Sequence, residues 1–309
     1  MTRWEDPAWR DEAEAWIRAH VAPAGLIAVV RIRPWSAVLR VPTKDGLVYF
    51  KEQQESLAHE PRLIEILRGR HAELVTDVLV ADDRRMLMRD GGVQLSELPA
   101  DDQLRHWEQA LPLYAELQID AAPDADELLR AGAFDRRAVV LPGLFERLLE
   151  DAHGLSRDEI EGLRALVPEV ERVAAQLAEH AVPETINNDD FTNGSIFVRG
   201  GSYRFLDWGD ACVSHPFFTL TVSLRVVELQ HRLPAVSPAV ARLRDAYLEP
   251  FTRFAPLREL VPVADDARRF GQICRAALRA ENPSWESPEV LPDLLRLLLD
   301  PEIWRTWND

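Results

Sequence analysis

A short β-hairpin inside helical sequence is the feature that most restricts how this 309-residue chain can fold. Residues 195–198 and 203–206 read as strands, and the Arg-Gly-Gly-Ser sequence between them is typical of a turn. Asp190 stands just before the first strand, and Asp207 stands just after the second. A hairpin brings its outer ends together, because paired strands lie about 4.8 Å apart. The sequence therefore predicts that these two distant carboxylates converge.

Two converging carboxylates repel each other unless a cation lies between them. Oxygen ligands on irregular backbone suit Mg²⁺ in particular. The hairpin alone leaves two interpretations equally open. Asp190 and Asp207 form a metal site, or they are two solvated acids at the ends of a loop.

The first third of the chain reads as a sheet with one helix. Asp45-Gly46 between two strand-like runs is a strong hairpin signal. Short connections favour an antiparallel sheet of five strands with one helix packed on it. The predicted strands are residues 26–33, 36–41, 47–52, 75–81 and 85–89, and the helix is residues 57–70.

The rest of the chain is mostly helical. We therefore predict an α+β fold with two lobes, an N-terminal lobe of residues 1–92 and a helical lobe of residues 93–309 that contains the hairpin. Apolar residues recur at helical spacing in residues 101–117, 156–179, 237–251 and 291–299.

The charge of the chain argues against nucleic acid as a partner. The formal net charge is -16, whereas phosphate backbones require basic patches. Residues 93–309 carry 22 basic and 37 acidic side chains, and residues 1–92 carry 14 and 15. An acidic lobe can attract a cationic substrate, although a well-hydrated surface explains the charge equally well.

Other features bear on location. No run of 18 apolar residues occurs, so we expect no transmembrane helix and no membrane partner. The first 16 residues lack the apolar core of a signal peptide. Cys212 and Cys274 are the only cysteines, and their spacing fits no metal motif. These observations predict a cytoplasmic protein.

Three segments together resemble the aminoglycoside phosphotransferase and choline kinase-like family. Residues 188–198, Asn-Asp-Asp-Phe-Thr-Asn-Gly-Ser-Ile-Phe-Val, resemble its catalytic loop, which typically reads His-Gly-Asp-Leu-His-Pro-Gly-Asn-Ile-Leu. Residues 206–210, Leu-Asp-Trp-Gly-Asp, resemble its metal-binding segment, and residues 48–51, Val-Tyr-Phe-Lys, resemble the strand with its ATP-binding lysine. The likeness covers roughly residues 27–225 and implies a bilobal protein-kinase-like fold that binds ATP and Mg²⁺.

The resemblance implies a role for each matching residue. Asp190 matches the catalytic base that orients or deprotonates the acceptor hydroxyl, and Asp207 matches the acid that holds Mg²⁺. Lys51 matches the lysine that contacts the α- and β-phosphates, and such a lysine pairs with a helix glutamate. Glu60 is the best candidate for that partner, and Glu65 is the alternative.

Proline limits how the Glu60 helix can begin. Pro61 follows Glu60 directly, and proline is tolerated only in the first turn of a helix. We therefore expect this helix to begin near Glu60.

Three further residues are candidates for nucleotide contacts. Residues 86–92 would connect the lobes, where backbone groups can bind adenine, so Met88 and Asp90 are expected there. Ser36 lies in a loop that would cover the phosphates, although that loop contains no glycine.

The catalytic loop departs from the family pattern at three positions. Ser195 stands where the family has a magnesium-binding asparagine, and its hydroxyl is a shorter ligand. Asn188 replaces a histidine, and like it can both donate and accept hydrogen bonds. Asp189 replaces a glycine. An alternative register would make Asp189 the base and Asn193 the amide ligand, but the register with Asp190 aligns the apolar positions better.

The sequence thus predicts an ATP- and Mg²⁺-dependent phosphotransferase that acts on a hydroxyl of a small molecule, with a cationic molecule such as an aminoglycoside or amino alcohol as one candidate and a sugar as another. Asp210 and Glu228 are the candidates for acceptor contacts. Two other interpretations stay open. One is a degenerate kinase fold that binds nucleotide without transfer, and the other is a helical interaction protein whose motifs match by accident.

Overall fold

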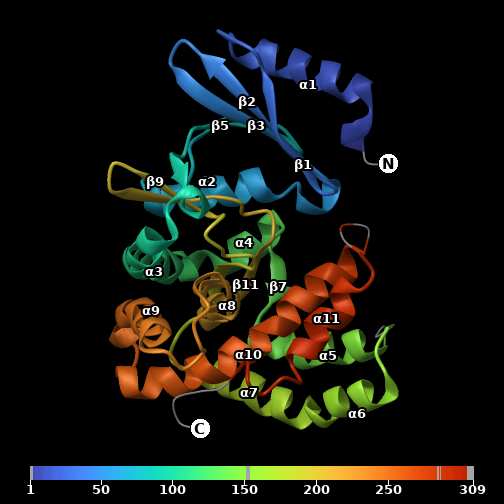
Figure 1. Ribbon diagram of the computed structural model, residues 1–309, viewed down its shortest axis with the longest axis vertical. Coiled ribbons are helices and arrows are strands. Elements are labelled where there is room, and N and C mark those ends of the chain that lie inside the picture. The colour runs from blue at the N-terminus through green and yellow to red at the C-terminus, as the bar shows by residue number, and fades with distance from the viewer. Residues whose placement is uncertain (1–2, 151–153, 284, 286, 305–309) are drawn as a thin grey trace.

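An antiparallel sheet of five strands forms the upper lobe in Figure 1. This computed structural model describes residues 3–150, 154–283, 285 and 287–304. The sheet order is β1-β2-β3-β5-β4, which confirms the predicted sheet. Its strands are β1 (Ala28–Arg33), β2 (Ser36–Thr43), β3 (Gly46–Gln53), β4 (Val78–Ala81) and β5 (Arg85–Arg89).

Strict alternation along β3 decides which side chains reach the space between the lobes. Val48 and Phe50 pack under helix α1 (Pro7–His20), which the sequence analysis did not predict. Tyr49 and Lys51 point to the opposite face, because successive side chains of a strand alternate. The apolar face of α1, with Trp9 and Ile17 buried, therefore fixes the direction of Lys51 through the strand.

Helix α2 (Glu60–His71) covers the face of the sheet opposite α1 (Figure 1). Leu63, Ile64 and Leu67 pack there against Met86 and Met88 of β5. The helix begins at Glu60, with Pro61 in its first turn, as predicted.

The embedded hairpin consists of β9 (Ile196–Arg199) and β10 (Ser202–Phe205). It is part of a three-stranded sheet, because β6 (Val93–Gln94) pairs with β9. The segment that connects the lobes therefore runs directly alongside the hairpin.

A third small sheet, which the sequence analysis missed, leads directly into the predicted catalytic loop of residues 188–198. Strand β11 (Ala211–Ser214) pairs parallel with β7 (Phe134–Arg136) and antiparallel with β8 (Thr185–Asn188). All four residues of β8 and of β11 are buried. Strands this short carry little periodic signal, and their pairing is set by tertiary contacts.

The lower lobe is mostly helical, as predicted. Residues 156–179 form two helices rather than one, because Pro168 is tolerated only in the first turn of a new helix. The longest helix, α10, packs against both α8 and α11. The helices are α3 (Ala100–Ala121), α4 (Ala125–Ala131), α5 (Leu141–Glu150), α6 (Arg157–Ala165), α7 (Val167–Glu179), α8 (Thr219–His231), α9 (Pro238–Leu248), α10 (Leu257–Glu281) and α11 (Val290–Leu297).

No helix in the described part of the chain is both long and apolar enough to span a membrane.

A buried histidine lies in the core of the lower lobe. His215 is fully buried, and its Nδ1 accepts a hydrogen bond from the Phe217 N–H at 3.3 Å. Its Nε2 has no hydrogen-bond partner among the described residues. Burial lowers the pKa of His215 to about 3, and the nearby His180 adds to this effect. The folded protein therefore keeps this imidazole neutral.

This imidazole makes stability depend on pH. In the unfolded chain a histidine binds a proton below about pH 6.5, whereas the folded protein resists doing so. Unfolding therefore takes up a proton, and stability falls as the pH drops from about 6.5 towards 3. We expect His215 to contribute about 2 kcal/mol to the loss between pH 7 and pH 5. Urea unfolding at both pH values measures this loss.

The variant His215→Asn keeps an acceptor for the Phe217 N–H and removes the titration. It should lose about 2 kcal/mol less than the wild type over the same interval. The exposed His20 provides the control His20→Asn, which should behave as the wild type. An equal loss in the wild type and His215→Asn would contradict this account.

Candidate active site

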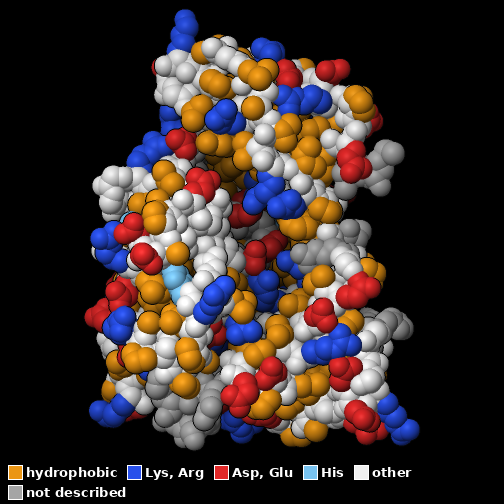
Figure 2. All heavy atoms as spheres, viewed as in Figure 1, with side chains coloured by type: hydrophobic (Ala, Val, Ile, Leu, Met, Phe, Trp, Pro, Cys, Tyr) orange, Lys and Arg blue, Asp and Glu red, His pale blue; other side chains and the backbone are white. Residues whose placement is uncertain are grey.

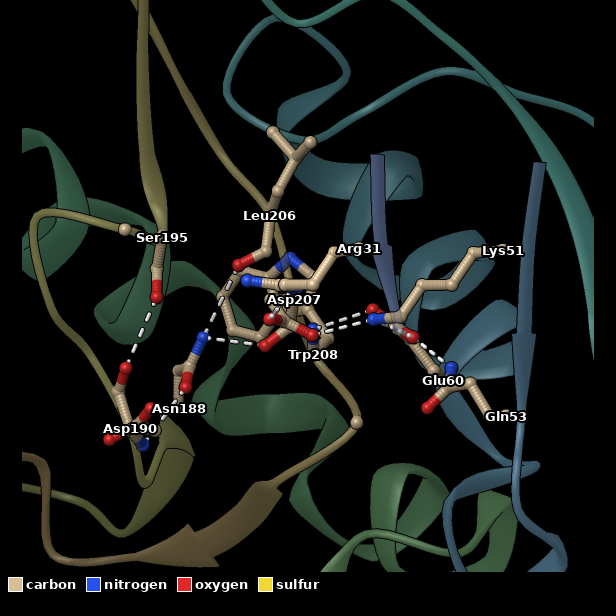
Figure 3. A network of polar contacts seen from close by, with 12 residues as sticks. Arg31, Lys51, Gln53, Glu60, Asn188, Asp190, Ser195, Leu206, Asp207 and Trp208 are labelled. Carbon is tan, nitrogen blue, oxygen red and sulfur yellow. Dashed lines mark hydrogen bonds and ion pairs between the residues drawn. The ribbon is translucent and has the colours of Figure 1, made fainter. Parts of the chain in front are cut away.

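One ammonium group joins the two lobes. The Nζ of Lys51 on β3 lies 2.7 Å from Oε2 of Glu60 on α2 and 2.5 Å from Oδ1 of Asp207 (Figure 3). The Lys51 side chain is 6% exposed and that of Glu60 is 1% exposed, whereas Asp207 is 47% exposed. The structure thus brings together the predicted lysine, its predicted helix partner and the predicted metal ligand.

The charges of this group depend on one another. Burial works to lower the pKa of Lys51, but the Asp207 and Glu60 carboxylates outweigh it and raise that pKa. Loss of hydration works to raise the pKa of Asp207, but the positive charges of Lys51 and Arg31 outweigh this effect. The pKa of Asp207 is therefore lowered. Lys51 is therefore protonated and Asp207 is ionised, the states needed to bind phosphate and a divalent cation.

Glu60 is held by three donors. Besides Lys51, its carboxylate accepts from the side chain of Gln53 and, at 2.8 Å, from the backbone N–H of Trp208. Its place at the start of α2 suits a carboxylate, because the N-terminus of a helix favours negative charge. Glu60 thereby links the upper lobe to the residue that follows Asp207.

Asp207 has a backbone conformation that side-chain-bearing residues rarely adopt. Its φ is +68°, in the left-handed region. The residues on both sides are tied down, since Leu206 N–H donates to the Ser195 carbonyl at 2.9 Å and Trp208 N–H donates to Glu60. Such conformations persist where the surroundings determine them and are common at functional sites.

Asn188 connects the two catalytic segments, as Figure 3 shows. Its Nδ2 donates to the Asp207 carbonyl at 2.8 Å, and its Oδ1 accepts from the Asp190 N–H at 3.1 Å. A side chain that can both donate and accept is required for this double contact. Asn188 therefore both donates and accepts, as predicted for the residue in place of histidine. Its two hydrogen bonds connect the backbone at Asp190 to the backbone at Asp207.

Asp190 lies at the mouth of the site and is paired with an arginine. Its side chain is 45% exposed, and its Oδ1 accepts from Nη1 of Arg275 on α10 at 2.7 Å. Nothing in the sequence around Arg275 indicates this contact, because 85 residues separate it from Asp190.

Two further acids lie close to Asp190. Burial raises the pKa of Asp189 to about 6, and Arg275 and Arg136 work against that rise. Burial raises the pKa of Asp210 to about 7, and the Asp190 and Asp207 carboxylates add to it. Both acids are thus partly protonated near neutral pH, whereas Asp207 is ionised.

Ser195 does not point at Asp207. Its hydroxyl donates to the Asp190 carbonyl at 3.1 Å (Figure 3). The amide of Asn193, the ligand in the alternative register, donates to Gln103 and Gln230 instead. Ser195 as a direct metal ligand stays a prediction that would require this hydroxyl to rotate or a water to bridge.

A cavity of about 360 Å³ opens beside Lys51. Figure 2 shows a hollow between the lobes in which acidic and basic side chains meet. Of the predicted nucleotide contacts, Lys51, Glu60 and Met88 line the cavity. Its apolar and charged walls further include Val38, Tyr49, Phe197, Leu206, Arg31 and Asp207.

Ser36 and Asp90 are not among the residues that line this cavity. Ser36 is buried and pairs with Gln53 in the β2–β3 ladder. The Asp90 carboxylate binds Arg199 at 2.5 Å, and its backbone N–H donates to Leu47. The carboxylate and the backbone N–H of Asp90 are therefore both bound within the protein.

The sequence analysis missed Arg31, which reaches the cavity from β1. Its Nη2 lies 3.5 Å from Oδ2 of Asp207, so both oxygens of that carboxylate face a cation. The alternation of side chains in β1 could have suggested Arg31, but nothing in the sequence marks one arginine among many.

A divalent cation would find a partial site. No cluster of three His, Cys, Asp or Glu side chains able to hold a metal occurs among residues 3–150, 154–283, 285 and 287–304. Mg²⁺ is commonly held by one or two carboxylates together with phosphate oxygens and water. The half-exposed carboxylate of Asp207 fits that requirement.

Comparison with solved structures agrees with this geometry. The chain is similar to an ethanolamine kinase from Plasmodium vivax, with 12% identity, a TM-score of 0.64, and coverage of 92% of this chain and 84% of that one. It is similar to the macrolide 2'-phosphotransferase MphH from Brachybacterium faecium, with 15% identity, a TM-score of 0.63, and coverage of 94% and 97%. It is also similar to the ADP-bound aminoglycoside phosphotransferase APH(2'')-Ib, with 14% identity, a TM-score of 0.60, and coverage of 94% and 97%.

No protein-family model matches the sequence, and no curated protein matches it. At these identities the likeness shows the fold. The chain has the bilobal protein-kinase-like fold of small-molecule kinases and phosphotransferases, the fold that the resemblance implied.

Removing the Asn188 side chain should destabilise the protein. Asn188→Ala leaves the Asp190 N–H and the Asp207 carbonyl without their partner, which costs about 1–3 kcal/mol for buried polar groups. Asn188→His retains a donor and an acceptor and should lose less. Urea denaturation measures both changes, and an alanine variant as stable as the wild type would show that Asn188 does not hold the site together.

Proposed function

We propose that this protein is an ATP- and Mg²⁺-dependent phosphotransferase that transfers the γ-phosphoryl group to a hydroxyl of a small molecule. One observation carries the proposal. Lys51 from the upper lobe pairs with both Glu60 and Asp207, and Asn188 ties Asp207 to Asp190. A buried lysine between two carboxylates fits a phosphate site, because the ammonium is then held protonated where a triphosphate would lie.

The cavity offers separate surfaces for base and phosphates. Val38, Met88 and Leu206 provide apolar contacts suited to a purine base. Lys51 and Arg31 provide the positive charges suited to phosphate oxygens. The ADP-bound structure of a phosphotransferase with this fold supports nucleotide binding here.

Phosphoryl transfer depends mostly on positioning and on neutralising charge. Bound Mg²⁺ would supply positive charge against the phosphates, and Asp207 is the residue placed to hold it. Asp190 is placed to accept the proton of the acceptor hydroxyl as the new O–P bond forms and the bond from the γ-phosphorus to ADP breaks. Only one of its oxygens is occupied by Arg275, so the other is available to the hydroxyl.

A small molecule is the preferred acceptor class. The structural neighbours are named for small acceptors, an amino alcohol, macrolides and aminoglycosides.

The two cysteines, Cys212 and Cys274, are free and buried, which fits the reducing environment of the cytoplasm.

Nucleotide binding should raise the melting temperature in a way that depends on Mg²⁺. Ligands that bind only the folded state stabilise it in proportion to their concentration and affinity. Asp207→Asn should abolish the Mg²⁺-dependent part of the shift produced by ADP. Arg31→Gln should weaken ADP binding about 5- to 20-fold while leaving adenosine binding unchanged, because we expect its guanidinium to meet the phosphates and not the base.

Arg62→Gln is the matched control for Arg31→Gln, since Arg62 is an exposed arginine of the same lobe that pairs with Glu65. An ADP shift that ignores Mg²⁺ would support the degenerate, non-transferring module instead.

Transfer itself should require Asp190. A positioned general base contributes about 10²- to 10⁴-fold to such reactions. Asp190→Asn should therefore reduce kcat by that order in an assay of ADP release with a panel of hydroxyl compounds, without loss of ADP binding. Unchanged turnover in Asp190→Asn would remove Asp190 from the chemistry and favour Asp189.

A further inference from the structure

Arg275 lies where an acceptor hydroxyl would have to approach Asp190. Its Nη1 donates both to Oδ1 of Asp190 at 2.7 Å and to the Asp189 carbonyl at 3.0 Å. Both contacts use the same nitrogen. An acceptor that reaches the free oxygen of Asp190 therefore arrives beside a guanidinium, a group that remains charged at all relevant pH values.

Among the described residues, only Nη1 of this guanidinium makes hydrogen bonds. Nε and Nη2 of Arg275 make no hydrogen bond to any residue within the described ranges, while the side chain keeps 20% of its surface exposed. Neither nitrogen is among the buried polar atoms that lack a partner, so both are open to water and to a ligand. The arrangement therefore suits a ligand that supplies acceptors at the mouth of the site.

The residues around Arg275 do not form a trap for cations. Asp189, Asp190 and Asp210 lie near it, but Arg136 of β7 and Arg279 of α10 lie near the same acids. Arg136 is paired with Glu281 at 2.5 Å. Acids and arginines thus alternate here, and Figure 2 shows both kinds of side chain in the hollow between the lobes.

Glu228, a predicted acceptor contact, is not available to a cation. It is buried on α8 against Arg268 of α10, and Arg225 lies 3.6 Å from its second oxygen. Glu228 therefore adds no free carboxylate for a cationic acceptor.

We propose that Arg275 binds an oxyanion of the acceptor, so that the substrate is a hydroxyl compound with a carboxylate or phosphate group rather than a cation. The planar fork of arginine matches such oxyanions and can bind one through Nε and Nη2 while Nη1 keeps its contact with Asp190. One residue then sets the distance between the anion and the hydroxyl that is phosphorylated. The inference rests on the proposed phosphotransferase function and reverses the charge expected from the acidic lobe.

The test compares matched acceptors. ADP release is measured with hydroxy acids such as glycerate and gluconate, with their uncharged amides, with glycerol phosphate against glycerol, and with choline and ethanolamine as cations. The wild type should favour the anionic member of a pair by about tenfold or more in kcat/KM, the size of a charged hydrogen bond. The carboxylate and phosphate pairs show which oxyanion is bound.

Variants of Arg275 assign the preference. Arg275→Gln should raise KM for the anionic acceptor about tenfold or more, bring it level with the neutral member, and leave KM for ATP unchanged. Arg275→Lys should keep part of the preference, because the charge remains. Arg258→Gln, on an exposed arginine in the first turn of the same helix, is the control and should match the wild type.

Three results would overturn the proposal. They are a wild-type preference for neutral or cationic acceptors, no acceleration by any anionic acceptor, and an equal loss for both members of a pair in Arg275→Gln. The last result would make Arg275 only a support for Asp190. The wild-type preference requires no variant, so the test stands even if Arg275→Gln fails to fold. Turnover of any neutral or cationic acceptor in the same panel would leave the phosphotransferase function standing, whereas no turnover of any acceptor would count against that function itself.

Discussion

The contact of Lys51 with Glu60 and Asp207 is the interaction on which the rest of this structure depends. Strand β3, helix α2 and the segment after the hairpin meet at this point. A buried charge needs partners, and removing one partner of a buried pair typically costs about 3–5 kcal/mol. The packing of α1 and α2 on opposite faces of the sheet therefore fixes the direction of the Lys51 side chain, which meets Asp207 in its left-handed backbone conformation.

Asn188 extends this arrangement to Asp190, the proposed catalytic base. Through one side chain, the backbone around Asp190 and the backbone around Asp207 become a single unit. The position held by histidine in the family pattern thus keeps its structural role with a smaller residue.

An arginine side chain contacts each of the two aspartates, Asp207 and Asp190. Arg31 approaches Asp207 from β1, and Arg275 approaches Asp190 from α10. In the proposed function each arginine meets a ligand oxyanion, Arg31 that of the nucleotide and Arg275 that of the acceptor. Charge at this site is thus balanced by residues far apart in the chain, and a total charge of -16 says little about what the cleft attracts.

The sequence by itself determined the five-stranded antiparallel sheet of the upper lobe, the helix that begins at Glu60, and the hairpin. It also identified Lys51, Asp190 and Asp207 as candidate site residues. These features are local: alternation, turn residues and proline act over a few positions, and the motifs are short. Only the tertiary structure decided that Arg31 and Arg275 face the acids, that Glu228 is consumed by Arg268, and that Ser195 points at the Asp190 carbonyl. Those contacts join residues from separate elements, and no local pattern specifies which of many arginines a folded chain brings to a given carboxylate.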